Sequence, residues 1–183
     1  MRLFTAIDIP AGVLENLTAL LDKLAPAARI KWSPPSNLHI TTKFIGEWPE
    51  ERLPELKKAL DGVPPRAAIP IRIRQVGFFP NPHSPRVFWA GIEAPADLAN
   101  LARDTDRATA ALGVPSEQRA FSPHLTLARI QEPVPLQKLR QEIDGLSSLD
   151  FGGFEADRFY LYLSRMQAGG SVYTKLSEFP LSK

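Results

Sequence analysis

The sequence predicts an α+β fold with two lobes, each built on an antiparallel sheet, related by a pseudo-twofold axis around a central cleft. Two observations lead to this prediction. Strand-like and amphipathic helix-like segments follow one another in the same order in both halves of the chain. No glycine-rich strand-to-helix turn indicates a doubly wound parallel sheet. We therefore expect a single bilobal domain over residues 1–183, with sequence halves of roughly 1–80 and 85–183.

The first strand candidate in each half carries the same series of residues. Residues 2–10 read RLFTAIDIP and residues 86–95 read RVFWAGIEAP. With one extra residue at Gly91, both contain arginine, phenylalanine, alanine, isoleucine, an acid and proline in that order. Beyond Gly91 the matched positions are 85 residues apart. This self-similarity indicates a tandem duplication of a β-α-β-α-β unit.

Two helix candidates occur in each half. The first follows the Pro-ended strand and has apolar residues at helical spacing. The second is rich in charged residues and ends in Asp-Gly, where Gly62 and Gly145 are suitable helix stops. The predicted helices are residues 11–24, 50–63, 96–112 and 135–146.

Strand-rich runs follow the second helix candidate of each half. They cover residues 69–79 in the first half, and 154–163 and 171–179 in the second. The segment 78–86, FFPNPHSPR, is rich in proline, asparagine and serine, which is typical of a linker. We expect this linker to lie between the two halves.

Composition excludes several classes of site. The chain has no cysteine, which rules out disulfides, thiolate metal sites and cysteine nucleophiles. A formal net charge of +2 favours polyanions only weakly. Because it has neither a long apolar run nor a secretory h-region, we expect a cytoplasmic protein that does not enter a membrane. We also expect a monomer.

Two of the three histidines are followed by threonine at the second position. His39 and Thr41 form the first pair, and His124 and Thr126 form the second at an offset of 85. On a strand, residues i and i+2 lie on one face, so each pair presents an imidazole and a hydroxyl together. Each motif alone fits a hydrogen-bonded strand histidine beside a β-preferring threonine. The shared offset favours a common function.

Phosphodiester cleavage is the chemistry that best matches such a pair of motifs. Near neutral pH one imidazole can be neutral and the other protonated, because the reference pKa of histidine is about 6.5. One ring can then accept a proton from water while the other protonates the departing ribose oxygen. Threonine hydroxyls can donate hydrogen bonds to the non-bridging oxygens. We expect no metal and no cofactor, since two histidines without a carboxylate cluster make a poor metal site.

The sequence resembles a known family in these segments. HITTKFIGE and PHLTLARI, together with RLFTAIDIP and GFFPNPHSPRVFWAGI, resemble the LigT-like RNA 2′,3′-cyclic phosphodiesterases, also called 2′-5′ RNA ligases, of the two-histidine phosphoesterase superfamily. The resemblance covers nearly the whole chain. It implies hydrolysis of a terminal RNA 2′,3′-cyclic phosphate to a 2′-phosphate, reversible 2′-5′ ligation of tRNA halves, and binding of nucleotides.

The resemblance also implies residue roles. His39 would be the proton donor, His124 the proton acceptor, and Thr41 and Thr126 would bind the phosphate. The spacing alone does not decide which histidine is the acid. Two further residues are candidates for substrate binding. Lys43 would share the face of His39 by simple alternation, whereas Arg129 would lie opposite His124 unless a β-bulge intervenes.

Other side chains are weaker candidates for contacts with RNA. The third histidine, His83, is expected in a surface loop. Cations could line a groove for the RNA backbone, and aromatic side chains could stack on a base. The cations are Arg2, Lys31, Arg72, Arg74 and Arg165, and the aromatic residues are Trp32, Trp48, Phe78, Phe79 and Trp89.

Two rival functions remain open from sequence alone. The first is a two-histidine esterase acting on small cyclic nucleotides or a nucleotide-sugar cyclic phosphate. The second is a non-catalytic module that binds RNA ends, in which the histidines only recognise phosphate. Comparing the turnover of RNA oligomers with that of small cyclic nucleotides distinguishes the first rival from an RNA phosphodiesterase. Binding of RNA ends without turnover would identify the second rival.

Overall fold

A computed structural model describes residues 1–183. The four α-helices are α1 (Ala11–Leu24), α2 (Leu53–Asp61), α3 (Ala96–Ala110) and α4 (Gln137–Asp144). The strands are β1 (Arg2–Asp8), β2 (Lys31–Trp32), β3 (His39–Glu47), β4 (Ile69–Phe79), β5 (Val87–Glu93), β6 (His124–Arg129), β7 (Asp150–Ala156), β8 (Arg158–Gln167) and β9 (Gly170–Pro180). Short 3₁₀ turns lie at Ala25–Ala27, Pro35–Asn37 and Glu50–Arg52.

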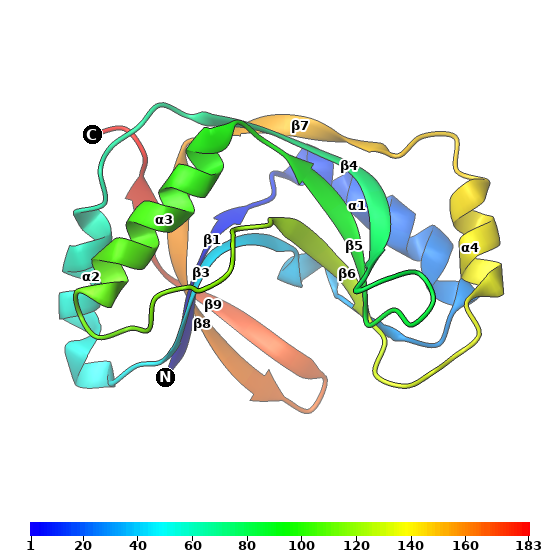
Figure 1. Cartoon of the computed structure of the whole chain (residues 1–183), viewed down its shortest axis with the longest axis horizontal. Coiled ribbons are helices and arrows are strands. Elements are labelled where there is room, and N and C mark those ends of the chain that lie inside the picture. The colour runs from blue at the N-terminus through cyan, green and yellow to red at the C-terminus, as the bar shows by residue number, and fades with distance from the viewer.

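The strands form two antiparallel sheets, which confirms the predicted α+β class (Figure 1). Sheet A has the order β3-β1-β8-β9, and sheet B has the order β2-β6-β5-β4-β7. In both sheets the strand that begins with a motif histidine pairs with the Pro-ended strand of its own half. The two motifs therefore occupy related places, one in each sheet.

Each sheet contains strands from both halves of the sequence. In sheet A the third strand, β8, comes from the second half, and in sheet B the corresponding strand, β4, comes from the first half. The predicted run 154–163 is divided at Asp157, where the chain passes from β7 in sheet B to β8 in sheet A. This exchange of strands means that the boundary between the sequence halves is not a boundary between the sheets.

The helices cover the outer faces of the sheets in pairs. Helices α2 and α3 lie together at one end of the molecule, where α3 packs on β3, and α1 and α4 lie at the other end, where α1 packs on β7 (Figure 1). The apolar face of α1 recurs every three or four residues, as expected of an amphipathic helix. Its buried side chains are Val13, Leu17, Leu20, Leu21 and Leu24. None of the helices is long and apolar enough to span a bilayer.

Both motif strands contain a β-bulge at the same place. Pairing with β1 skips Thr42, and pairing with β5 skips Leu127, so the skipped residues are again 85 positions apart. A bulge opposes two residues to one and shifts the alternation of side chains by one position. After each bulge, residues that simple alternation places on one face of the sheet therefore lie on the other.

Candidate active site

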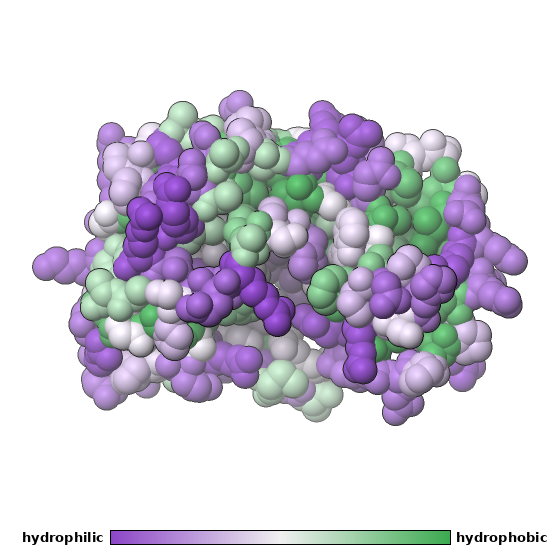
Figure 2. Space-filling view, in the orientation of Figure 1, coloured by the Kyte–Doolittle hydropathy of each residue, from purple (hydrophilic) through white to green (hydrophobic).

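A cleft of about 570 Å³ lies between the two sheets. Its walls come from β1, β2, β3, β6 and the hairpin of β8 and β9. Figure 2 shows the molecule hollowed near its middle, with hydrophilic side chains beside the hollow. A cleft of this volume is in the range of small-molecule sites, about 300–1,000 Å³. It has room for a nucleotide.

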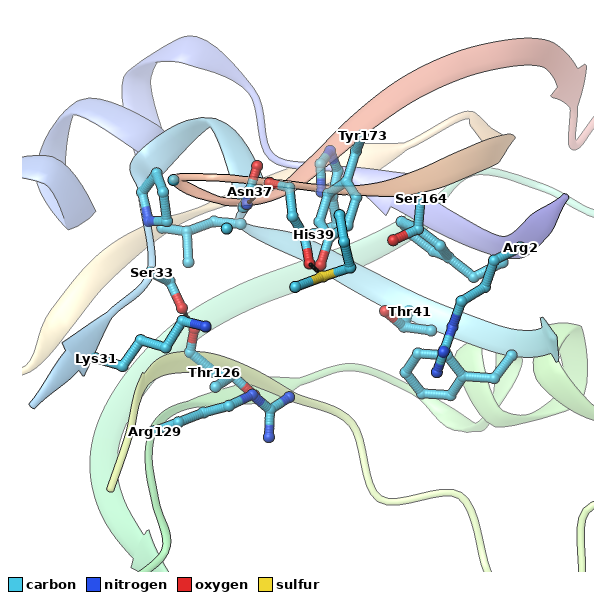
Figure 3. Close-up of a pocket in the computed structure, with 18 of the residues that line it drawn as sticks. Arg2, Lys31, Ser33, Asn37, His39, Thr41, Thr126, Arg129, Ser164 and Tyr173 are labelled. Atoms are coloured by element: carbon cyan, nitrogen blue, oxygen red, sulfur yellow. Dashed lines mark hydrogen bonds between the residues drawn. The ribbon is translucent and has the colours of Figure 1, made fainter. Parts of the chain in front are cut away.

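Four of the predicted site residues line this one cleft. They are His39 and Thr41 from β3, and Thr126 and Arg129 from β6. In Figure 3, Thr126 and Arg129 lie on one wall, and His39 and Thr41 lie on the wall facing them. The two motifs thus contribute side chains to a common space from the two sheets.

His39 is held in a largely buried position. Its ring contacts Tyr162 and Tyr173, with centroid distances of 4.5 Å and 5.8 Å. Nδ1 is buried near the carbonyl of Asn37 without a hydrogen bond of standard geometry, and Nε2 lies 3.6 Å from Oδ1 of Asp8. Nε2 is therefore the nitrogen that can reach a ligand.

The pKa of His39 is lowered from the ordinary histidine value. Burial is the largest influence and lowers the pKa, because the charged ring loses solvation. The negative charge of Asp8 and the carbonyl of Asn37 raise the pKa, and the positive charge of Lys175 lowers it. An anion in the cleft would add a further influence that raises it.

His124 lies at the start of β6 and is exposed, and it is not among the residues that line the cleft. Its Nδ1 lies 3.0 Å from the carbonyl oxygen of Ser122. A carbonyl only accepts, so Nδ1 carries a proton and, in the neutral ring, Nε2 carries the free lone pair. His124 is two residues from Thr126, with Gly91 opposite it on β5. A Cβ atom at Gly91 would lie 2.6 Å from the carbonyl oxygen of Arg74, so only glycine fits there.

Thr41 and Thr126 are both half-buried at the wall of the cleft. The structure contains no internal hydrogen bond to the hydroxyl group of either residue, so both are free to donate to a ligand. The backbone at Thr126 is fixed, because the Ser33 hydroxyl donates to its carbonyl oxygen at 2.8 Å. Both hydroxyls project from strands that are hydrogen-bonded within their own sheets.

The bulges decide the places of Lys43 and Arg129. Arg129 lies beyond the bulge at Leu127, so its side chain joins the cleft beside Thr126 (Figure 3). The expectation that Lys43 shares the face of His39 is wrong. The bulge at Thr42 turns Lys43 toward α3, where its side chain is 4% exposed.

Lys43 instead fixes the loop that leads to His124. Its Nζ donates to Oδ1 of Asp106 at 2.6 Å and to the carbonyl oxygen of Pro115 at 2.9 Å. The amide of Glu117 donates to the same carboxylate at 3.0 Å. Burial alone would raise the pKa of Asp106, but these hydrogen bonds outweigh it and lower the pKa. Lys43 therefore links the first motif strand to the segment before the second.

We expect Lys43→Met to lower the free energy of unfolding by about 2 kcal/mol or more, because it leaves the Asp106 carboxylate without its cation. Chemical denaturation measures this change. Lys58→Met, which alters an exposed lysine of α2, is the matched control and should change stability little. Equal stabilities for Lys43→Met and the unmodified protein would contradict a structural role for this ion pair.

The lining of the cleft is cationic. Arg2, Lys31 and Arg129 contribute positive charge, and no aspartate or glutamate is among the lining residues. Such a surface attracts anions and concentrates them. Two other predicted cations are engaged elsewhere: Arg72 binds Asp150, and Arg74 lies against an acid of β5.

Several lining residues were not predicted from the sequence. Phe44 is 71% exposed and Met166 is 74% exposed, both at the cleft, where Tyr173 and Ser164 also contribute. Among the predicted aromatic residues, only Trp32 lines the cleft. The place of Phe44 at the cleft could have been predicted from the sequence, because Phe44 lies 85 residues before Arg129, the same offset that relates the two motifs. The bulge places both on the cleft side.

Comparison with known proteins agrees with this geometry. The model of the LigT like Phosphoesterase family matches residues 7–89 and again residues 92–173. The two matched segments begin 85 positions apart, as the two motifs do. An RNA 2′,3′-cyclic phosphodiesterase of Methanocaldococcus jannaschii is 35% identical over 98% of this chain and 100% of its own length.

Solved structures give the same result for the fold. A crystal structure of a Thermus thermophilus protein has a TM-score of 0.82 and 33% identity, covering 99% of this chain and 98% of that one. E. coli LigT complexed with 3′-AMP has a TM-score of 0.79 and 27% identity, covering 100% of this chain and 98% of that one. The arrangement of both sheets is thus similar to that of LigT.

Proposed function

Since the chain belongs to the LigT-like phosphoesterase family, we propose that it is an RNA 2′,3′-cyclic phosphodiesterase that leaves a 2′-phosphate. The observation that carries this proposal is the cationic cleft into which the His39 and Thr126 strands of two sheets both project. The relatives named for this activity, which match nearly the full chain, support it.

In the proposed reaction His124 is the base and His39 is the acid. Nε2 of His124 accepts a proton from water as the water oxygen bonds to phosphorus. The bond between phosphorus and the ribose O3′ breaks, and His39 transfers its proton to O3′. The tautomer of His124 supports its role as acceptor, since the Ser122 carbonyl fixes the proton on Nδ1. The phosphodiester charge raises the pKa of His39 when substrate binds and so favours its protonated form.

The hydroxyls and cations stabilise the charge that develops on the phosphate. Thr41 and Thr126 donate to non-bridging oxygens, and Arg129 supplies a guanidinium, which suits phosphate geometry. Lys31 and Arg2 extend the positive surface beyond the phosphate. This surface supports an RNA end as substrate, and the same groups would serve the reverse 2′-5′ ligation.

Product analysis tests the assignment. With an oligonucleotide ending in a 2′,3′-cyclic phosphate, we expect the protein to yield the 2′-monophosphate end, resolved from the 3′-monophosphate by chromatography. Comparing oligomers with 2′,3′-cyclic mononucleotides and ADP-ribose cyclic phosphate separates RNA from small substrates. Equal or faster turnover of the small compounds would shift the assignment to a small-nucleotide esterase, and binding without turnover would shift it to an end-binding module.

We expect turnover to persist in EDTA at an unchanged rate, because the two imidazoles supply both proton transfers. Initial rates on a cyclic-phosphate oligonucleotide, measured before and after dialysis against the chelator, provide the comparison. Loss of activity in EDTA, with recovery on adding a divalent metal, would contradict proton transfer by histidine alone.

A further inference from the structure

Asp8 is the last residue of β1 and lies directly opposite His39 in sheet A. Its Oδ1 lies 3.6 Å from Nε2 of His39. This separation is longer than a hydrogen bond, yet short enough for a strong charge interaction in a partly buried site. Nε2 therefore remains free for a ligand while it lies in the field of the carboxylate.

The Asp8 carboxylate is itself fixed from two sides. The hydroxyl of Tyr162 donates to Oδ1, and Nζ of Lys175 donates to Oδ2 at 2.7 Å. Lys175 also lies over the ring of Tyr160, 3.8 Å from its centroid. Burial, and next the hydrogen bond to Asp8, raise the pKa of Tyr162, so this hydroxyl keeps its proton as a donor. None of these contacts is needed to close the sheet, since β1 and β8 pair through their backbones.

The second half of the chain has no such carboxylate. Gly91 lies opposite His124 and has no side chain. Glu93, which matches Asp8 in the sequence repeat, lies 3.5 Å from Nε of Arg74 and is 57% exposed. Two histidines that are equivalent by sequence therefore have different electrostatic surroundings. Such a difference separates an acid from a base.

We propose that Asp8 is a positioning residue for His39, holding the ring toward the cleft and stabilising its protonated form. This inference rests on the proposed function in assigning His39 the role of proton donor. The titratable groups that face the ring are Asp8 from β1, Tyr162 from β8, and Tyr173 and Lys175 from β9. Among them Asp8 is the acid, and Lys175 opposes its effect on the ring.

The kinetic test compares Asp8→Asn with Glu93→Gln. In Asp8→Asn we expect kcat to fall by about tenfold or more, with KM nearly unchanged, because proton transfer rather than binding is impaired. Loss of the carboxylate lowers the pKa of His39, so the alkaline limb of the kcat profile should move to lower pH. Glu93→Gln makes the same kind of change at the repeat-related position and should leave both parameters and the profile unchanged. An unchanged kcat and profile in Asp8→Asn would overturn the inference.

A direct titration of His39 decides the inference independently of turnover. We expect the imidazole signals of His39, followed by NMR in the free protein, to titrate at lower pH in Asp8→Asn. In Lys175→Gln, which can still donate to Asp8 but carries no charge, they should titrate at higher pH. If Asp8→Asn does not fold, the direction of the change in the pKa of His39 in Lys175→Gln decides the inference. An unchanged pKa of His39 in the variant that folds rejects it. If no cyclic phosphate is cleaved, the proposed function fails while these titrations still test the role of Asp8.

Discussion

Replacing either motif histidine by alanine is expected to reduce kcat by about 10³-fold or more, because each substitution removes one of two required proton transfers. In the proposed mechanism, His39 supplies the proton for the leaving oxygen, and His124 removes a proton from water. Apart from His39, the lining of the cleft contains no histidine, aspartate or glutamate that could take over a proton transfer near neutral pH. Initial rates on a cyclic-phosphate oligonucleotide measure the loss.

The third histidine provides the control. His83 is exposed in the loop between β4 and β5, where its backbone amide donates to the side chain of Asn81. His83→Ala should retain full activity. Thermal unfolding must show that all three variants fold. Full activity in His39→Ala or His124→Ala would remove that residue from the mechanism.

The second large effect concerns the threonine hydroxyls. Thr41→Val and Thr126→Val keep the size and β-branching of the side chain but remove the hydroxyl that we propose donates to the phosphate. Losing one such donor typically costs about 10²-fold in kcat. We expect a loss of this order for each variant, with a smaller change in KM, because the hydrogen bond strengthens as charge develops on the oxygens.

Thr174→Val is the matched control for these substitutions. Thr174 is an exposed threonine of β9 that does not line the cleft. The same initial-rate assay should give wild-type kcat and KM for it. If Thr41→Val and Thr126→Val behave like Thr174→Val, the hydroxyls do not contact the phosphate in the transition state.

Much of the fold could be predicted because its signals are local. Apolar spacing and Asp-Gly stops located all four helices, and the predicted segment 50–63 contains α2 with a 3₁₀ turn before it. The exchange of β4 and β8 between the sheets could not be predicted, because strand pairing joins residues far apart in the chain. The two-residue strand β2 is too short to give a periodic signal.

The face of the sheet on which a side chain lies was harder to predict than the position of the strand itself. Phe4 and Phe88 match in the sequence repeat, yet Phe4 packs with Tyr162 beside the cleft and Phe88 lies in the main core. One residue of register reverses the face of every side chain, and the insertion at Gly91 changes that register. The bulge had the same effect on Lys43. The face that each side chain occupies depends on which strands pair and in which register, and the sequence alone does not give that pairing.

The site could be predicted only as far as its repeated residues. The two His-x-Thr motifs could be predicted as site residues because they repeat at a fixed offset. Asp8 has a repeated partner in Glu93, but that acid lies beside Arg74 and not opposite His124, so the repeat does not identify Asp8 as a neighbour of a motif histidine. Tyr173 belongs to neither motif. Asp8 is brought to His39 by the pairing of β1 with β3, and Tyr173 by the pairing of β1 with β8 and of β8 with β9, which joins positions more than 130 residues apart.

A crystal structure with a nucleoside 2′-monophosphate bound tests most directly whether both motifs act on one phosphate. We predict a phosphate in the cleft with its oxygens within about 3 Å of the hydroxyls of Thr41 and Thr126 and of Nε2 of His39 and His124. A phosphate that contacts the residues of only one motif, with the other histidine turned away from it, would contradict the account.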